Sequence, residues 1–82
     1  MRLIRIMESY ERGVFILEDS SGGGRKPVGP LGRLLGEADR LLRGQTASVL
    51  VLDRDREVRC CRRYRPGWPV EEEDPAAIRA GF

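Results

Sequence analysis

The segment that most constrains the fold is residues 46–68, which has the pattern of two strands joined by a charged turn. Residues 49–52 form a short, continuous apolar run, and such a run is typical of a strand buried on both faces. Residues 53–56 alternate aspartate and arginine and have the length of a tight turn. Residues 57–64 alternate in polarity, which indicates a second strand. We expect this strand to turn Val58 and Cys60 toward the core and Glu57, Arg59, Cys61 and Arg63 away from it.

The preceding part of the chain contains two more strand patterns. Residues 2–7 and 13–18 are rich in apolar side chains, and the short connection between them favours a β-hairpin. Residues 19–29 contain three successive glycines and predict a loop, because glycine loses the most conformational entropy in regular structure. This loop lacks the G-x-x-x-x-G-K-[ST] spacing of a phosphate-binding P-loop.

One strong helix pattern occupies residues 30–43. Leucine and alanine recur there at helical spacing and form a single apolar stripe. Gly29 is expected as the N-cap and Gly44 as the residue that ends the helix. The stripe consists of Leu31, Leu34, Leu35, Ala38, Leu41 and Leu42.

The order strand, strand, loop, helix, strand, strand predicts an α+β fold. Two β-hairpins joined by one amphipathic helix are expected to form an antiparallel sheet with the helix on one face (ββαββ). Residues 1–68 then make a single α+β domain, and residues 69–82 make an irregular acidic tail with a short helix at 74–79. A helix with one apolar stripe covers only one face of a sheet. The other face is left for a second copy of the chain, a partner protein, or the tail with Trp68, Val70, Ile78 and Phe82.

Length, charge and cysteine use narrow the class of protein. Eighty-two residues make one small domain, and the net charge of +2 is not that of a strongly basic protein. Arg and Lys outnumber Asp and Glu by fourteen to nine in residues 1–65, whereas residues 66–82 have one cation and four acids. Cys60 and Cys61 are adjacent, so we expect free thiols in a reducing cytoplasm. We expect neither a signal peptide nor a membrane span.

The composition also argues against several chemistries. The chain has no histidine, which removes histidine acid–base catalysis and histidine metal ligands. Two adjacent cysteines do not make a zinc site by themselves, and no histidine base is present to activate either one as a nucleophile. We therefore expect a non-enzyme that uses no metal and no cofactor.

The distinctive chemical feature is a group of six arginines within residues 54–65, followed and interleaved by aromatic side chains. Arginine beside aromatic rings suits phosphate contacts and base stacking. It equally suits a protein–protein hot spot, and a charged edge strand that prevents aggregation is a third interpretation. The expected partner-binding residues are Arg56, Arg59, Arg62, Arg63, Tyr64, Arg65 and Trp68, with Arg25 and Lys26 as a mobile second contact.

The run Arg62-Arg63-Tyr64-Arg65-Pro66-Gly67-Trp68, at the end of a small hairpin–helix–hairpin, resembles small phage-encoded anti-CRISPR proteins. The resemblance covers size and architecture across residues 1–68. It implies a monomeric or homodimeric protein that binds a CRISPR surveillance complex and blocks target DNA or nuclease recruitment. The main alternative is a module that binds nucleic acid directly. A second resemblance is to ribosome-dependent RNase toxins of the RelE type, whose C-terminal strands also run into arginine and tyrosine.

Overall fold

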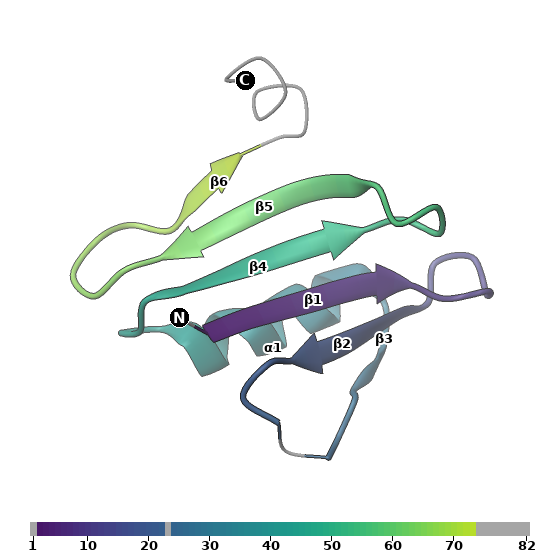
Figure 1. Ribbon diagram of the computed structural model, residues 1–82, viewed down its shortest axis with the longest axis horizontal. Coiled ribbons are helices and arrows are strands. Elements are labelled where there is room, and N and C mark those ends of the chain that lie inside the picture. The colour runs from purple at the N-terminus through teal and green to yellow at the C-terminus, as the bar shows by residue number, and fades with distance from the viewer. Residues whose placement is uncertain (1, 23, 74–82) are drawn as a thin grey trace.

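The structure of the protein is a computed structural model that describes residues 2–22 and 24–73. Within these residues one helix accompanies a single six-stranded sheet, whose strand order is β3-β2-β1-β4-β5-β6 (Figure 1). The elements are β1 (Arg2–Glu8), β2 (Phe15–Asp19), β3 (Val28–Gly29), α1 (Leu31–Leu42), β4 (Ala47–Leu52), β5 (Val58–Tyr64) and β6 (Glu71–Glu73).

The α+β class predicted from the sequence is confirmed, but the expected antiparallel ββαββ sheet is wrong in two respects. The sheet is mixed, because its central strands β1 and β4 pair in parallel. The helix causes this arrangement, since it carries the chain back to the end of the sheet at which β1 begins (Figure 1). The sheet also gains β3 within the glycine-rich loop and β6 within the predicted irregular tail. The short helix expected at 74–79 lies outside the described residues.

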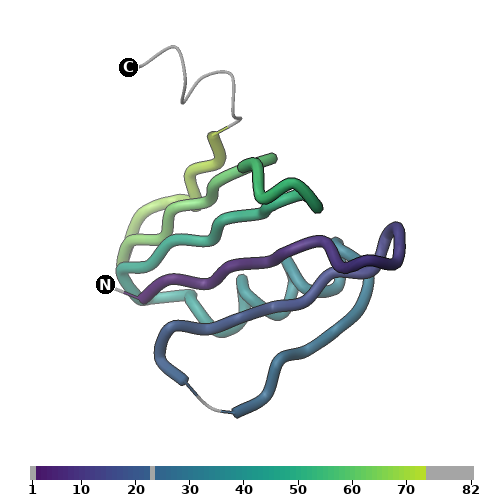
Figure 2. The backbone as a smooth tube through the Cα atoms, turned by 45° about the vertical axis from the view of Figure 1, so that its right-hand side comes forward, coloured from purple at the N-terminus to yellow at the C-terminus, as the bar shows by residue number. Residues whose placement is uncertain are grey.

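The hydrophobic core lies between α1 and one face of the sheet. Figure 2 shows the helix along a single side of the strands. The molecule measures 35 × 32 × 19 Å, and its shortest dimension is consistent with two packed layers. The helix stripe is confirmed for its buried members, although Leu41 lies on the exposed side. The core residues are Ile4, Ile6, Phe15, Leu17, Leu34, Ala38, Leu42, Ala47, Val49, Val51 and Tyr64.

The predicted end of α1 is confirmed at its C-terminus but not at its N-terminus. Gly44 has a φ of 78°, a left-handed conformation that glycine adopts without strain, and it ends the helix as expected. The N-cap is Pro30 and not Gly29. The carbonyl oxygen of Pro30 accepts hydrogen bonds from the backbone N–H groups of Arg33 and Leu34 at 3.1 and 3.2 Å.

A bulge in β5 changes the expected facing of its side chains. Val51 pairs with Cys60 but Leu52 pairs with Val58, so Arg59 is an extra residue without a partner in β4. Directly paired residues lie on the same face of a sheet. Cys60 therefore packs against the core, whereas Val58 lies on the opposite face. The prediction that Val58 and Cys60 share a face is wrong for this reason.

The sheet face opposite α1 has no helix or strand over it in the described part of the chain, and we call it the open face (Figure 1). Trp68 and Val70 were expected to help cover it, but they are 64% and 42% exposed, and Ile78 and Phe82 lie outside the described residues. No helix in the described segments is both long and apolar enough to cross a membrane. The pairing register places seven apolar side chains on the open face: Leu3, Met7, Ile16, Leu50, Leu52, Val58 and Cys61.

An ion pair between Arg2 and Asp19 fastens the start of β1 to the end of β2. The Nε of Arg2 donates to Oδ1 of Asp19 at 3.1 Å, and a second guanidinium nitrogen contacts the other carboxylate oxygen. The hydrogen bonds from Arg2 hold the pKa of Asp19 well below its usual range. Both side chains are at most about a quarter exposed, so solvent screens this pair less than a surface pair.

Leu34→Ala should lower the free energy of unfolding by about 2–5 kcal/mol, because it opens a cavity between α1 and the sheet. Leu41→Ala is the matched control, since it makes the same change on the exposed side of the same helix. Its cost should be below about 1 kcal/mol, and urea denaturation measures both values. Equal losses for the two variants would contradict the described packing of α1.

Arg2→Met should destabilise the protein by about 1–2 kcal/mol at pH 7, because it removes hydrogen bonds to an ionised carboxylate. The pKa of Asp19 is lowered on folding, so this stabilisation is present above the unfolded-state pKa of about 4 and is lost as the pH falls below it. Urea denaturation between pH 2 and pH 7 tests this dependence. The difference in unfolding free energy between Arg2→Met and the wild type should therefore shrink as the pH falls. Arg65 makes no ion pair with the described residues, so the corresponding difference for Arg65→Met should not change with pH.

Candidate partner-binding surface

The sheet divides the arginines of residues 54–65 between its two ends. Arg54, Arg56 and Arg59 lie at the turn between β4 and β5, whereas Arg62, Arg63 and Arg65 lie where β5 leads toward β6 (Figure 1). The expectation that Arg59, Arg63 and Arg65 project together depended on Val58 and Cys60 sharing a face, and the bulge at Arg59 removes that basis. Two separate surfaces must be considered.

The first surface combines two turns that lie at the same end of the sheet (Figure 1). We call it the loop-end surface, and it consists of Tyr10 and Arg12 from the β1–β2 connection and Arg54, Arg56 and Arg59 from the β4–β5 region. All five are exposed, and Tyr10 is 100% exposed. Arg54, Tyr10 and Arg12 were not among the contact residues expected from the sequence. The parallel pairing of β1 and β4 is what brings the turn of Tyr10 and Arg12 beside the arginines.

Hydrogen bonds within each turn hold the loop-end surface in shape. In the β4–β5 turn, Oδ1 of Asp53 accepts from the backbone N–H of Asp55 at 2.8 Å and from that of Glu57 at 3.0 Å. Arg56 has a φ of 64°, a left-handed conformation that is uncommon for a residue with a side chain. In the β1–β2 connection, the backbone N–H of Ser9 donates to the carbonyl oxygen of Val14 at 2.8 Å.

The loop-end surface has mixed charge. A groove of about 320 Å³ lies between the two turns and is lined by Glu8, Arg12, Asp53, Arg54, Asp55 and Arg59. None of the four arginines of the surface forms an ion pair with another residue of the described part. The same two turns contain five carboxylates, namely Glu8, Glu11, Asp53, Asp55 and Glu57.

At the other end of the sheet, β6 neutralises two of the arginines. The Nε of Arg62 donates to Glu72 at 3.2 Å, and Arg63 lies 3.9 Å from Glu73. Burial works against the charge of Arg62, but Glu72 and Tyr64 outweigh it, so the pKa of Arg62 is raised. Arg65 is exposed and Trp68 is 64% exposed beside them. This end therefore presents arginine, tryptophan and glutamate together.

Tyr64 belongs to the core and not to either surface. It is 3% exposed, and its hydroxyl group donates to Oδ1 of Asp39 in α1 at 3.2 Å. Arg43 pairs with the other oxygen of the same carboxylate at 2.9 Å. Burial and the Asp39 carboxylate both raise the pKa of Tyr64. Its expected role in partner binding is thus replaced by a role in fastening β5 to α1.

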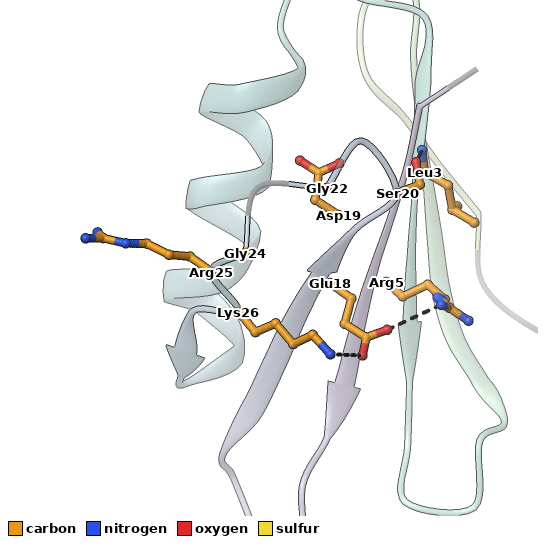
Figure 3. A pocket seen from close by; sticks show the side chains of 9 residues that line it. All are labelled: Leu3, Arg5, Glu18, Asp19, Ser20, Gly22, Gly24, Arg25 and Lys26. Atoms are coloured by element: carbon orange, nitrogen blue, oxygen red, sulfur yellow. Dashed lines mark hydrogen bonds and ion pairs between the residues drawn. The ribbon is translucent and has the colours of Figure 1, made fainter.

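The expected second contact, Arg25 and Lys26, lies at the edge of the open face. Figure 3 shows Lys26 and Arg5 reaching Glu18 from opposite sides, at 3.2 and 3.3 Å, while Arg25 points away. These residues border a cavity of about 250 Å³. The pair to Glu18 leaves Lys26 only partly available to a partner.

The two cysteines are free thiols on opposite faces of β5. Burial, followed by the negative charge of Glu72, raises the pKa of Cys60, which reduces the fraction of reactive thiolate at neutral pH. In the part of the chain that the structure describes, no three His, Cys, Asp or Glu residues are arranged to hold a metal ion.

Comparisons of this chain with protein-family models, with curated proteins and with solved structures give no match.

Tyr64→Phe should lower the free energy of unfolding by about 1 kcal/mol, because it removes the hydrogen bond to Asp39 and leaves the packed ring in place. Tyr10→Phe makes the same chemical change at a fully exposed position and should be neutral within about 0.5 kcal/mol. Urea denaturation compares the two variants. A neutral Tyr64→Phe would show that the hydroxyl group does not fasten β5 to α1.

Proposed function

We propose that this protein is a non-catalytic binding protein that occupies the surface of a protein partner through its loop-end surface. The observation that carries this proposal is the group of four arginines without ion pairs among the described residues, next to the fully exposed ring of Tyr10. Arginine and tyrosine dominate the energetics of protein–protein hot spots. The ring of Tyr10 exposes apolar surface to water, and its burial against a partner would favour binding.

The charge of the surface favours a protein over a nucleic acid. A phosphate backbone requires a groove in which positive charge predominates. Five carboxylates at the end of β1 and in the two turns accompany the four arginines of the loop-end surface. At the other end of the sheet, glutamates of β6 pair with Arg62 and Arg63. Interspersed charges of both signs suit a protein surface of complementary pattern, where they direct orientation and partner choice.

The proposed partner is a nucleic-acid-handling protein complex, and the effect is inhibition by occupation of its working surface. This part of the proposal follows from the resemblance to small anti-CRISPR inhibitors. The proposed contact residues keep Arg56 and Arg59 from the sequence prediction and add Tyr10, Arg12 and Arg54, which are exposed at the same end of the sheet. Trp68 and Arg65, at the far end of β5, form a second exposed Arg/aromatic pair.

Binding to immobilised, purified CRISPR surveillance complexes should be measured by biolayer interferometry, together with inhibition of target DNA cleavage. Arg54→Ala combined with Arg59→Ala should weaken binding by at least about tenfold, since hot-spot arginines contribute more than about 1.4 kcal/mol. Arg33→Ala combined with Arg40→Ala removes the same charge from the exposed side of α1 and should bind as the wild type does.

A titration with labelled single- and double-stranded DNA and RNA at two salt concentrations provides the contrasting measurement. We expect no binding at physiological salt. Micromolar binding that weakens steeply with salt would contradict the proposal and establish a direct nucleic-acid-binding module. Failure of every surveillance complex to bind would refute the proposed class of partner.

A further inference from the structure

The open face carries an apolar row near the end of the sheet that holds the loop-end surface, whereas Arg5 stands at the middle of β1 on the same face. One row of four side chains, Ile16, Met7, Leu52 and Val58, crosses β2, β1, β4 and β5 in succession. In the next row Leu50 and Cys61 continue the apolar area, and the charged side chains of Glu18, Arg5 and Glu73 flank them. At the usual strand spacing these four strands span about 15 Å. A row of this kind is normally buried under a second layer, and no described element supplies one.

A hollow at one end of this row shows that the face is incomplete. The hollow has a volume of about 270 Å³, and Met7 and Ile16 contribute its apolar lining. The charged residues of its lining are three cations, Lys26, Arg54 and Arg56, and two carboxylates, Glu8 and Glu18, and Tyr10 borders it as well. Its mixed apolar and charged lining is suited to an apolar side chain that arrives together with acidic groups.

The charges on the two flanks of the open face have opposite sign. On the β2 side, Arg5 and Lys26 share the single carboxylate of Glu18 (Figure 3), which leaves an excess of positive charge. On the β5–β6 side, the pairing register places Glu71 and Glu73 beside the single cation Arg63, which leaves an excess of negative charge. Each flank therefore complements the other.

We propose that the open face binds a second copy of this chain, so that two sheets pack face to face in a two-fold symmetric dimer. A two-fold axis along the strands, between β1 and β4, places the β2 side of one copy over the β5–β6 side of the other. The apolar row of one copy then faces the same row of the other copy in reversed strand order. Ile16 lies opposite Val58, and Met7 lies opposite Leu52. The positive flank of each copy faces the negative flank of its partner, and both contacts occur twice.

This arrangement suits the rest of the molecule. Sheets that pack face to face keep their strand directions within about 30° and bury their inner rows between them. An axis along the strands keeps both loop-end surfaces at the same end of the dimer. Arg12 and Arg59 of the two copies then lie at the same end, next to Tyr10, Arg54 and Arg56, which line the hollow at the edge of the proposed interface. Two adjacent sets of contact residues raise the strength of binding to a partner with two sites.

Sedimentation analysis of the full chain across about 1–100 μM tests the proposal, because a dimer doubles the mass of 9.3 kDa. We expect a dimer in the micromolar range. Leu52→Glu should dissociate it, because it introduces a charge into the apolar row. Leu41→Glu places the same charge on the exposed side of α1 and should leave the dimer intact.

Charge-reversal variants distinguish the proposed two-fold arrangement from non-specific hydrophobic association through the open face. Lys26→Glu and Glu73→Lys should each weaken the dimer by about tenfold, because each variant places like charges on facing flanks. An equimolar mixture of the two variants should recover dimerisation, since every facing pair is then opposite in sign. A dimer that is insensitive to the charge reversals, or a mixture that does not recover, overturns the proposed arrangement.

A wild-type protein that remains monomeric at the highest concentration overturns the proposal. Two further results then identify the state of the face. A monomer in which Leu52→Glu lowers the urea midpoint indicates that another segment of the same chain covers the open face. A monomer in which Leu52→Glu leaves the midpoint unchanged indicates a face that is free for a different protein.

Discussion

The parallel pairing of β1 and β4 is the constraint on which the rest of the structure depends. Ile4 and Ile6 of β1 lie beside Val49 and Val51 of β4, and all four are almost completely buried under α1. Because the two strands run in the same direction, the turns that follow them emerge at the same end of the sheet. Tyr10 and Arg12 thereby come to lie near Arg54 and Arg59 (Figure 1). The fold thus creates a surface that neither hairpin contains alone.

Periodicity within the sequence was sufficient for the elements that contain the core. The stripe of α1 and the apolar runs of β1, β2 and β4 were located correctly, because each depends on the spacing of side chains within one segment. The direction of β4 relative to β1 depends on which strands become neighbours, and no single segment determines that. The bulge at Arg59 and the three-residue strand β6 carry no apolar alternation, so pattern alone did not reveal them. The facing of the β5 side chains was mispredicted at this bulge, and the position of Tyr10 near Arg54 depends on the same neighbouring of strands.

The arginines of β5 show how sequence clusters are modified by a fold. Six arginines close together in sequence suggest a strong positive field, yet three glutamates in β6 pair along β5 and compensate two of them. The same glutamates place charge on an outer strand, which discourages pairing with further strands. Tyr64, between Arg63 and Arg65, turns inward and bonds Asp39. Because successive residues of a strand point to opposite faces, arginines that are adjacent in the sequence of β5 are divided between the two faces of the sheet.

The size of α1 explains why it covers only one face of the sheet within residues 2–22 and 24–73. A helix of twelve residues is about 18 Å long and about 10 Å wide, whereas six strands span about 24 Å. One such helix covers only part of one face, and a chain of this length has little left with which to build a second layer. Cys61 is nevertheless only 7% exposed on the open face. Its neighbours there, Arg63 and Glu73, have aliphatic stems that shield apolar surface while their charges remain in water. Part of the open face is thus protected by its own charged flank, whereas the row through Met7 and Leu52 is only partly buried and borders a hollow.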